Sequence, residues 1–266
     1  MRGVIQQTLC QQMTHFSRPT VNSTAALVLR SLSDEPETRA QTVILYVFIR
    51  SPMTSSLSRH PAFLSLQGGI NFRDPGEVAR TPDKLSPLTH YLNAPANPPV
   101  SEVNAKVTEL NAATLNALNG EQFMLQLYRQ LPFNNPAYRQ LAAWLTTPFE
   151  GALLQHCAVG KDRTGVGCAL TLFAVGCDSE TVMEEYLLTH GMLTQVEAWM
   201  LELLGNDLTA QGRQSLADIL TVKESYLAAA LSAIHQRYGT VDAWLAAEYQ
   251  LTAPVRAALQ ARLLEE

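Results

Sequence analysis

The chain has 266 residues, of which 47% are hydrophobic and 16% are charged, and its formal net charge at pH 7 is -5. This composition is sufficient for one sizeable hydrophobic core. The acidic balance disfavours a general nucleic-acid binder, which needs a basic face. No apolar run reaches the length of a membrane span, and the N-terminus lacks the basic-then-apolar plan of a secretory signal. We therefore expect a globular protein with no transmembrane segment and no nucleic-acid partner.

The N-terminal part of the chain carries little periodic pattern, and a polar break occupies residues 33–38. We expect residues 1–40 to be a divergent or poorly ordered extension, and residues 41–266 to form a single domain. The first strongly patterned segment, residues 42–49, is a continuous run of apolar, β-branched and aromatic residues. Such a run predicts a buried strand.

Further along the chain, apolar runs and turn residues alternate. Strands are predicted near 66–72 and at 151–156, and the Pro- and Asn-rich segment 86–100 is predicted to be a loop. Helical spacing of apolar residues predicts helices over 101–120, 121–131, 137–145, 166–175, 179–190, 196–204, 216–219, 225–238, 242–250 and 254–264. Strands separated by helices predict an α/β fold with a central, mostly parallel sheet flanked by helices.

The stretch with the clearest chemistry is His-Cys-Ala-Val-Gly-Lys-Asp-Arg-Thr-Gly at residues 156–165, between a predicted strand and a predicted helix. The N–H groups of a tight loop and of a helix N-terminus together bind anions. Cys157 at the base of such a site is favoured as a nucleophilic thiolate. Arg163 can donate two parallel hydrogen bonds to two phosphate oxygens.

Three other interpretations fit the residues of this loop less well. Cys157 as a buried structural thiol does not account for the Gly, Arg and Thr residues around it. A nucleotide-binding P-loop requires Ser or Thr after the Lys, where this chain has Asp162, and Gly at the position of Gln155. A sulfur-transferring loop of the rhodanese type is disfavoured by the Asp-Arg-Thr-Gly ending.

The loop resembles the signature of the cysteine-dependent protein tyrosine phosphatases. Its Gly-Lys-Asp-Arg-Thr-Gly ending is similar to that of the bacterial tyrosine/serine phosphatases, some of which also act on phosphoinositides. The resemblance covers roughly residues 70–266, with weaker echoes from 42, and it implies a phosphotyrosine-phosphatase-like fold with a helical lid over 101–131 and a helical C-terminal part. The alternative for 101–131 is an ordinary pair of amphipathic surface helices. The physiological substrate, a peptide or a lipid, stays open.

The resemblance implies a role for each loop residue. Cys157 would attack phosphorus and form a phosphocysteine, Asp162 would be general acid and then base, and Arg163 would bind the non-bridging oxygens. The substrate phosphate would be bound by the rest of the loop, namely Ala158, Val159, Gly160, Lys161, Thr164 and Gly165. We expect Lys161 to add positive charge beside the phosphate, Thr164 to hydrogen-bond the departing thiolate, and His156 to orient the loop.

Asn71, Arg73 and Glu77 belong to a second informative segment. It aligns with the family either as an Asn-Phe-Arg-Asp segment near the start of the domain or, as we prefer, as the later strand end Asp-Leu-Arg-x-x-x-Glu. In the preferred alignment Asn71 and Arg73 support the site wall, and Asn71 replaces a carboxylate. The opening segment of the family would then be missing, so residues 1–40 are hypothesised to be a divergent, truncated or misread version of it.

The expected function is that of a protein tyrosine phosphatase, with activity on other phosphomonoesters left open. Arg163 and the backbone amides supply the positive charge, so we expect no metal and no cofactor. The alternative is a catalytically impaired phosphate-binding module, which the aberrant N-terminal third and the replacement at Asn71 motivate. The four cysteines show no paired framework and no metal-ligand spacing, and a nucleophilic thiol needs a reducing compartment, so a cytoplasmic location is expected.

Overall fold

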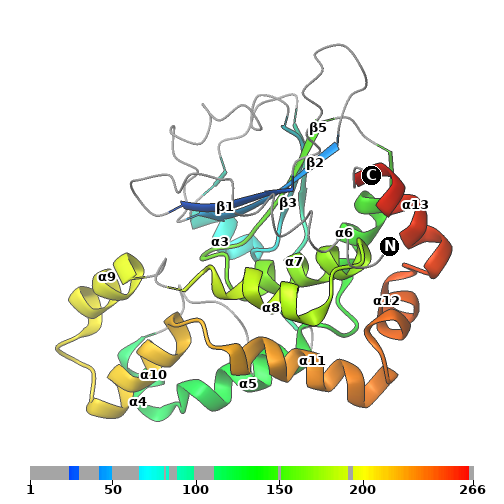
Figure 1. The fold of residues 1–266 in the computed structure, drawn as a ribbon. Helices are drawn as coiled ribbons and strands as arrows, with labels where there is room; N and C mark the ends of the chain where they lie inside the picture. Colours follow the sequence, from blue (N-terminus) through cyan, green and yellow to red (C-terminus); the bar gives the residue numbers. More distant parts are fainter. Residues whose placement is uncertain are drawn as a thin grey trace.

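The computed structural model describes residues 24–29, 42–49, 66–80, 82–83, 89–98, 111–148, 151–190 and 194–263. Within these ranges the chain forms a sheet and a larger set of helices (Figure 1). The predicted α/β class is therefore confirmed. None of the helices in these ranges is long and apolar enough to cross a lipid bilayer.

The sheet has five strands in the described residues, in the spatial order β1-β2-β5-β3-β4. The strands are β1 (Thr24–Leu29), β2 (Thr42–Ile49), β3 (Leu66–Asn71), β4 (His90–Asn93) and β5 (Gly151–His156). Strands β2, β5, β3 and β4 run parallel, and β1 is an antiparallel edge strand. The mostly parallel sheet and its three predicted strands are thus confirmed.

Two strands were not predicted from the sequence. Strand β4 lies inside the segment 86–100 that was expected to be a loop. It has only four residues and pairs along the edge with β3, so its pairing partner rather than its own composition makes it a strand. Strand β1 lies within residues 1–40, and the proposed boundary at residue 40 stays a prediction.

The helices cover most of the chain after the third strand. They are α3 (Pro75–Arg80), α4 (Ala112–Ala117), α5 (Gly120–Gln130), α6 (Pro136–Thr146), α7 (Arg163–Ala174), α8 (Ser179–Leu187), α9 (Thr194–Leu204), α10 (Ala210–Leu220), α11 (Glu224–Tyr238), α12 (Val241–Tyr249) and α13 (Ala253–Leu263). Helices α4 to α13 fall where helical periodicity was predicted, although residues 101–110 lie outside the described part. Helix α3 was not predicted, and α10 begins six residues before the predicted 216–219.

Short polar side chains set the helix starts. The Asn119 side chain accepts a hydrogen bond from the Gln122 N–H at the start of α5, and Asp178 caps α8 through the Thr181 N–H. Such caps satisfy N–H groups that have no partner within the helix. The early start of α10 has the same cause, because the Thr209 hydroxyl accepts from the Gly212 N–H.

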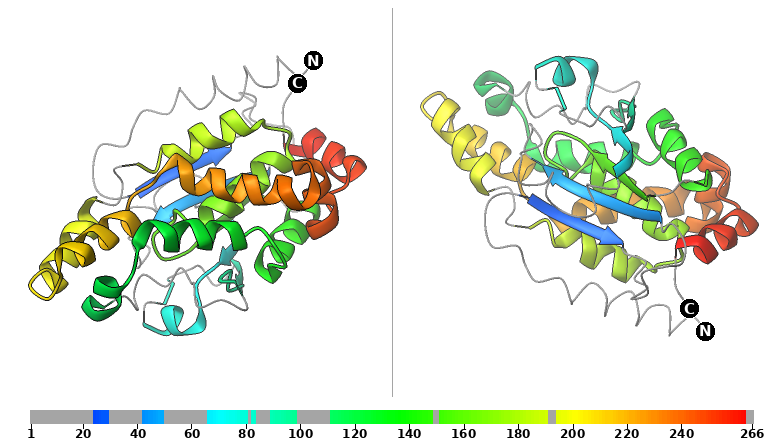
Figure 2. Two further views of the ribbon diagram at one scale, coloured as in Figure 1. Left: turned by 90° about the horizontal axis from the view of Figure 1, so that it is seen from below. Right: turned by 90° about the horizontal axis from the view of Figure 1, so that it is seen from above.

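Helix α7 is the centre of the helical layer. All of its residues are buried, and it contacts β5, β2, α6 and α8. Figure 1 shows α6, α7 and α8 between the sheet and the pair formed by α5 and α11. In the view from below, on the left of Figure 2, α5 and α11 run side by side. The hydrophobic core therefore surrounds the helix that follows the Cys-containing loop.

The topology brings two distant segments of the chain together at the carboxyl ends of the parallel strands. Strand β5 is the central strand, and β3 pairs beside it with Asn71 opposite His156. The Phe72 N–H continues this pairing by donating to the His156 carbonyl at 2.8 Å. Because parallel strands have their carboxyl ends on the same side of the sheet, the segment after β3 lies next to the loop after β5. Parallel sheets bind ligands at these carboxyl ends.

Candidate active site

The loop after β5 closes around the Cys157 sulfur. Gly160 has a φ of 82°, a conformation that glycine adopts without steric cost. This turn directs the Gly160 N–H to the Cys157 Sγ at 3.3 Å. Cys157 is only 2% exposed, so the N–H group, rather than bulk water, solvates the sulfur. The turn thus fixes a hydrogen-bond donor beside the sulfur.

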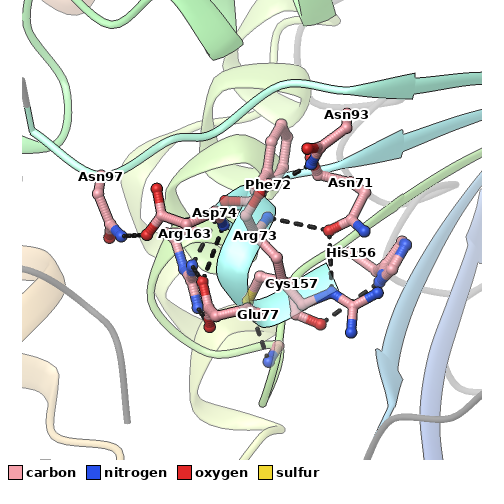
Figure 3. A network of polar contacts seen from close by, with 11 residues as sticks. Asn71, Phe72, Arg73, Asp74, Glu77, Asn93, Asn97, His156, Cys157 and Arg163 are labelled. Atoms are coloured by element: carbon pink, nitrogen blue, oxygen red, sulfur yellow. Dashed lines mark hydrogen bonds and ion pairs between the residues drawn. The ribbon is translucent and has the colours of Figure 1, made fainter. Parts of the chain in front are cut away.

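Arg163, the first residue of α7, is held by a carboxylate from another part of the chain. Its Nη1 lies 2.6 Å from Glu77 Oε2, and its Nη2 lies 3.0 Å from Glu77 Oε1 (Figure 3). This paired geometry fixes the plane of the guanidinium. Glu77 is 3% and Arg163 is 1% exposed, so the pair is an internal one.

The ionisation of this pair is consistent with its geometry. Burial disfavours the charged guanidinium, but the neighbouring Cys157 and Glu77 raise the pKa of Arg163 above its ordinary value. Burial likewise works against the Glu77 carboxylate, yet its hydrogen bonds and charge interaction with Arg163 lower the pKa of Glu77 below its ordinary value. Both groups therefore stay charged at neutral pH.

Further contacts fix both partners of the pair. The Tyr138 hydroxyl donates to the Arg163 carbonyl oxygen at 2.7 Å, at the first turn of α7. Glu77 Oε2 also accepts a hydrogen bond from the Asp74 N–H at 2.9 Å, which ties the carboxylate to the start of α3. Tyr138 thus fixes the backbone of Arg163, and Glu77 fixes its guanidinium.

Asn71 and Arg73 form a polar wall beside the loop. Asn71 Oδ1 accepts hydrogen bonds from the backbone N–H and the Nε–H of Arg73, at 2.9 and 3.1 Å. Asn71 Nδ2 donates to Asp83 Oδ2 at 2.8 Å and to the Tyr91 hydroxyl at 2.7 Å. The amide thus uses both its oxygen and its nitrogen, and a carboxylate at this position could not donate.

Asp83 is the carboxylate of this wall. It lies 2.7 Å from Arg73 Nη2, and its Oδ2 lies 3.2 Å from His156 Nε2. Burial acts to raise the pKa of Asp83, but His156, Arg73 and Tyr91 outweigh it and lower the pKa to about 2. A carboxylate is therefore present at the wall, although Asn71 replaces the one expected there.

Asp162, the last loop residue, is buried on the side of the helices. Its Oδ1 accepts from Lys161 Nζ at 2.6 Å and from the Tyr128 hydroxyl at 2.9 Å. The Lys161 ammonium also lies 5.6 Å from the centre of the Tyr226 ring and is fully buried. The ammonium of Lys161 therefore pairs with Asp162. Its direct contact with a substrate phosphate stays a prediction.

The remaining predicted loop residues differ in exposure. Ala158 and Val159 are partly exposed, whereas the rest of the loop is buried. The buried Thr164 hydroxyl has no hydrogen-bond partner in the described part of the chain, which leaves it able to bond a thiolate or a ligand. Gly165 packs against Tyr186, where a Cβ would lie 3.3 Å from two ring carbons.

The structure brings the segment of Asn71 and Arg73 next to His156 at the start of the loop, whereas Asp162 and Lys161 lie on the side of the helices. It also supports the strand-end alignment of 71–77, because this segment follows β3 and places Glu77 on Arg163 (Figure 3). Glu77 ends the pattern quoted for that alignment, so the sequence did contain a signal for it. Asp83, Tyr128 and Tyr138 were missed, and no local pattern marks them. In the described residues no cluster of three or more His, Cys, Asp or Glu side chains could hold a metal ion.

Comparison with known proteins places this geometry in a family. A model of the "tyrosine phosphatase family" matches residues 26–265. The triple specificity protein phosphatase PtpB of Mycobacterium tuberculosis is 34% identical over 134 residues, which are 47% of this chain and 49% of that protein. A Cupriavidus necator protein with the provisional name of a tyrosine-protein phosphatase is 29% identical over 184 residues, or 68% of this chain and 65% of that protein.

The matched regions span from about half to just under two thirds of the length of these curated relatives. The family match, in contrast, covers nearly the whole chain, including the loop at 156–165 and the segment that carries Glu77. On this basis the chain belongs to the tyrosine phosphatase family, as the resemblance of its loop predicted.

Proposed function

We propose that this protein is a tyrosine phosphatase that hydrolyses phosphomonoesters through a phosphocysteine intermediate. The observation that carries the proposal is the arrangement around Cys157: an N–H group directed at its sulfur, and Arg163 fixed by Glu77 at the other end of the same loop. This arrangement combines a stabilised thiolate with a rigid cation, which are the two requirements for attack on a phosphate dianion.

In the proposed first step, the Cys157 sulfur attacks phosphorus in line and the bond from phosphorus to the leaving oxygen breaks. Arg163 and the loop N–H groups bind the non-bridging oxygens, where charge is spread in the transition state. Asp162 donates its proton to the leaving oxygen. In the second step water attacks phosphorus, Asp162 accepts the proton, and the S–P bond breaks to release inorganic phosphate and the thiolate.

Phosphotyrosine is the first substrate class to test, because the family is defined by it. The relative from Mycobacterium tuberculosis is named for triple specificity, so phosphoserine, phosphothreonine and phosphoinositide substrates belong in the same panel. Ala158 and Val159 are the partly exposed residues of the loop, and neither side chain carries a charge that would select among these classes. The physiological substrate stays open, and the cytoplasmic location stays a prediction.

The test is hydrolysis of 4-nitrophenyl phosphate at about pH 6 with EDTA present, for the native chain, Cys157→Ser and Asp162→Asn. We expect turnover by the native chain and none by Cys157→Ser. Asp162→Asn is expected to be slower by about a hundredfold or more, with the largest loss for poor leaving groups. Rapid quenching of the Asp162→Asn reaction should trap phosphate on Cys157.

One outcome would favour the alternative of a phosphate-binding module. A folded native chain that binds vanadate but releases no phosphate from any substrate in the panel would contradict the proposal. Because Asn71 replaces a carboxylate of the family pattern, Asn71→Asp would then show whether that replacement caused the loss.

A further inference from the structure

The two oxygens of the Asp162 carboxylate have different surroundings. Oδ1 accepts two hydrogen bonds, one from the Lys161 ammonium at 2.6 Å and one from the Tyr128 hydroxyl at 2.9 Å. Oδ2 accepts no hydrogen bond from any residue in the part of the chain that the structure describes. Two donors on one oxygen fix the plane of the carboxylate and hold charge on that oxygen.

The Tyr128 hydroxyl is the middle member of a short chain of donors. Its oxygen lies 2.7 Å from the Tyr186 hydroxyl oxygen. The Asp162 carboxylate, at 2.9 Å, and the Lys161 carbonyl oxygen, at 3.2 Å, can only accept. The single Tyr128 proton therefore points to this pair, with Asp162 the nearer, and Tyr186 donates to Tyr128. Burial, followed by the nearby charge of Asp162, raises the pKa of Tyr128 well above its ordinary value, so the hydroxyl remains a donor.

These groups come from helices that pack on one another. Tyr128 lies on α5 and Tyr186 on α8, and both side chains are at most 2% exposed. Their rings meet edge to face, with centres 6.0 Å apart, and the Tyr226 ring of α11 lies 5.8 Å from that of Tyr128. The hydroxyl that reaches Asp162 is therefore held by interior packing and not by a mobile surface side chain.

We propose that Tyr128 is a positioning residue for Asp162, and that with Lys161 it reserves Oδ1 so that Oδ2 carries the proton exchanged with the leaving group. This inference rests on the proposed function, because it concerns the acid of that reaction. In the first step the Oδ2–H bond breaks and the leaving oxygen gains the proton, while Oδ1 keeps both donors. In the second step water gives its proton back to Oδ2.

The inference also assigns a role to the Lys161 side chain. Its ammonium is fully buried, pairs with Asp162 and lies near the Tyr226 ring. The ammonium thus acts on the carboxylate, whereas the backbone N–H of the same residue remains part of the phosphate-binding loop. Tyr128 can be tested more cleanly than Lys161, because Tyr128→Phe removes one hydroxyl and leaves the charge of the site unchanged.

The kinetic test compares Tyr128→Phe with Tyr249→Phe. Tyr249 is also buried, and its hydroxyl donates to the Pro132 carbonyl at 2.6 Å, away from Asp162. For Tyr128→Phe, kcat/KM with phenyl phosphate should fall about tenfold, and with 4-nitrophenyl phosphate by no more than about threefold, because the better leaving group needs less acid assistance. The alkaline limb of its pH profile should move to higher pH, because loss of the donor favours the protonated carboxyl.

A double-mutant cycle separates positioning from a general structural effect. In an Asp162→Asn background, Tyr128→Phe should cause little further loss, because the group that it positions no longer transfers a proton. Equal losses for both leaving groups with an unchanged pH profile would overturn the proposal. A full, additive loss in the Asp162→Asn background would overturn it as well.

A second readout does not need turnover and so separates this proposal from the proposed function. In protein labelled with ¹³C at aspartate carboxyl carbons, the resonance absent from Asp162→Asn reports on this group alone. Its titration midpoint should rise in Tyr128→Phe and stay unchanged in Tyr249→Phe. An unmoved midpoint would contradict positioning even in an active enzyme, and a moved midpoint in a protein without turnover would support it while the proposed function fails.

Discussion

The two sides of the catalytic loop are built from different chemistry. On the side of β3 and α3, the loop is held by buried charges: Glu77 pairs with Arg163, and Asp83 lies between Arg73 and His156. On the side of α5 and α8, the groups that other elements bring to Asp162 are neutral phenol hydroxyls, and the charged partner is the neighbouring loop residue Lys161. We call these the ionic wall and the phenol side.

The difference follows the charge of the loop residue that each side holds. Arg163 is a cation, and a buried cation is stable only with a carboxylate partner. Asp162 must change its protonation state in the proposed reaction, and neutral hydroxyls can accompany that change without acquiring a charge themselves. The comparison predicts that substitutions in the ionic wall disturb both stability and catalysis, whereas the phenol side is sensitive to added charge.

The strongest way to break the ionic wall is Glu77→Gln. The variant keeps the size of the side chain but leaves Arg163 buried without its carboxylate. We expect kcat/KM to fall about a hundredfold and the free energy of unfolding to fall by about 3 kcal/mol. Steady-state kinetics and urea unfolding measure the two effects.

The matched control is Asp242→Asn. It also removes a carboxylate from an arginine, Arg256, but Asp242 is 74% exposed. Both quantities should stay close to those of the native chain, because exposed ion pairs contribute little. If Glu77→Gln behaved like this control, the ionic wall would not hold Arg163 in the way inferred.

Glu185→Gln tests how the interior between α7 and α8 tolerates a charge. Glu185, next to Tyr186 on α8, is buried, and burial raises the pKa of Glu185 from 4.5 to about 7. In the unfolded chain Glu185 loses its proton at a lower pH than in the folded chain. Its ionisation therefore lowers the free energy of unfolding by about 3 kcal/mol as pH rises from about 4.5 to about 7. Glu185→Gln should lack that decrease.

The measurement is the free energy of unfolding at about pH 4.5 and about pH 8, for the native chain, Glu185→Gln and Glu184→Gln. Glu184 is the exposed neighbour on the same helix, so its variant should follow the native chain. Parallel pH dependence in all three proteins would show that the interior between α7 and α8 accepts a carboxylate.

Asn71→Asp adds a charge to the ionic wall. The new carboxylate would face Asp83, because the Asn71 amide nitrogen lies 2.8 Å from Asp83 Oδ2. Two carboxylates this close repel, and we expect a loss of about 1–2 kcal/mol in the free energy of unfolding at neutral pH. The loss should shrink at about pH 4, where one carboxyl can be protonated and donate to the other.

A charge swap makes this prediction sharper. Combining Asn71→Asp with Asp83→Asn restores one amide and one carboxylate at the contact, so part of the lost stability should return. If the double variant were less stable than Asn71→Asp alone, repulsion between the two positions would not be the cause. Urea unfolding at both pH values provides the comparison.

The smallest effect is expected for Lys223→Gln, which removes an ion pair near the molecular surface. Lys223 lies 3.1 Å from Glu121 and 2.9 Å from Asp218, and its side chain is 33% exposed. We expect a loss of no more than about 1 kcal/mol, which is largely removed in about 0.5 M salt. A loss as large as that of Glu77→Gln would mean that burial is not what distinguishes the ionic wall.

Local sequence was sufficient for much of the fold and for the loop itself. Strand β5, the loop and helix α7 are contiguous, so the order of an apolar run, a Gly-containing turn and a helical run places Cys157 and Arg163 at one site. The short edge strand β4 and helix α3 escaped prediction because a strand of four residues and a helix of six carry too little periodicity.

The partners of the loop were decided by the tertiary structure. Glu77 lies 86 residues from Arg163 in the chain, and Tyr128 lies 34 residues from Asp162. No local pattern encodes such contacts, because they depend on β3 pairing with β5 and on α5 packing near α8. The sequence by itself therefore determined which residues can carry out the chemistry. Packing of distant segments determined which charges and hydroxyls hold them, because burial and neighbouring groups exist only in the folded chain.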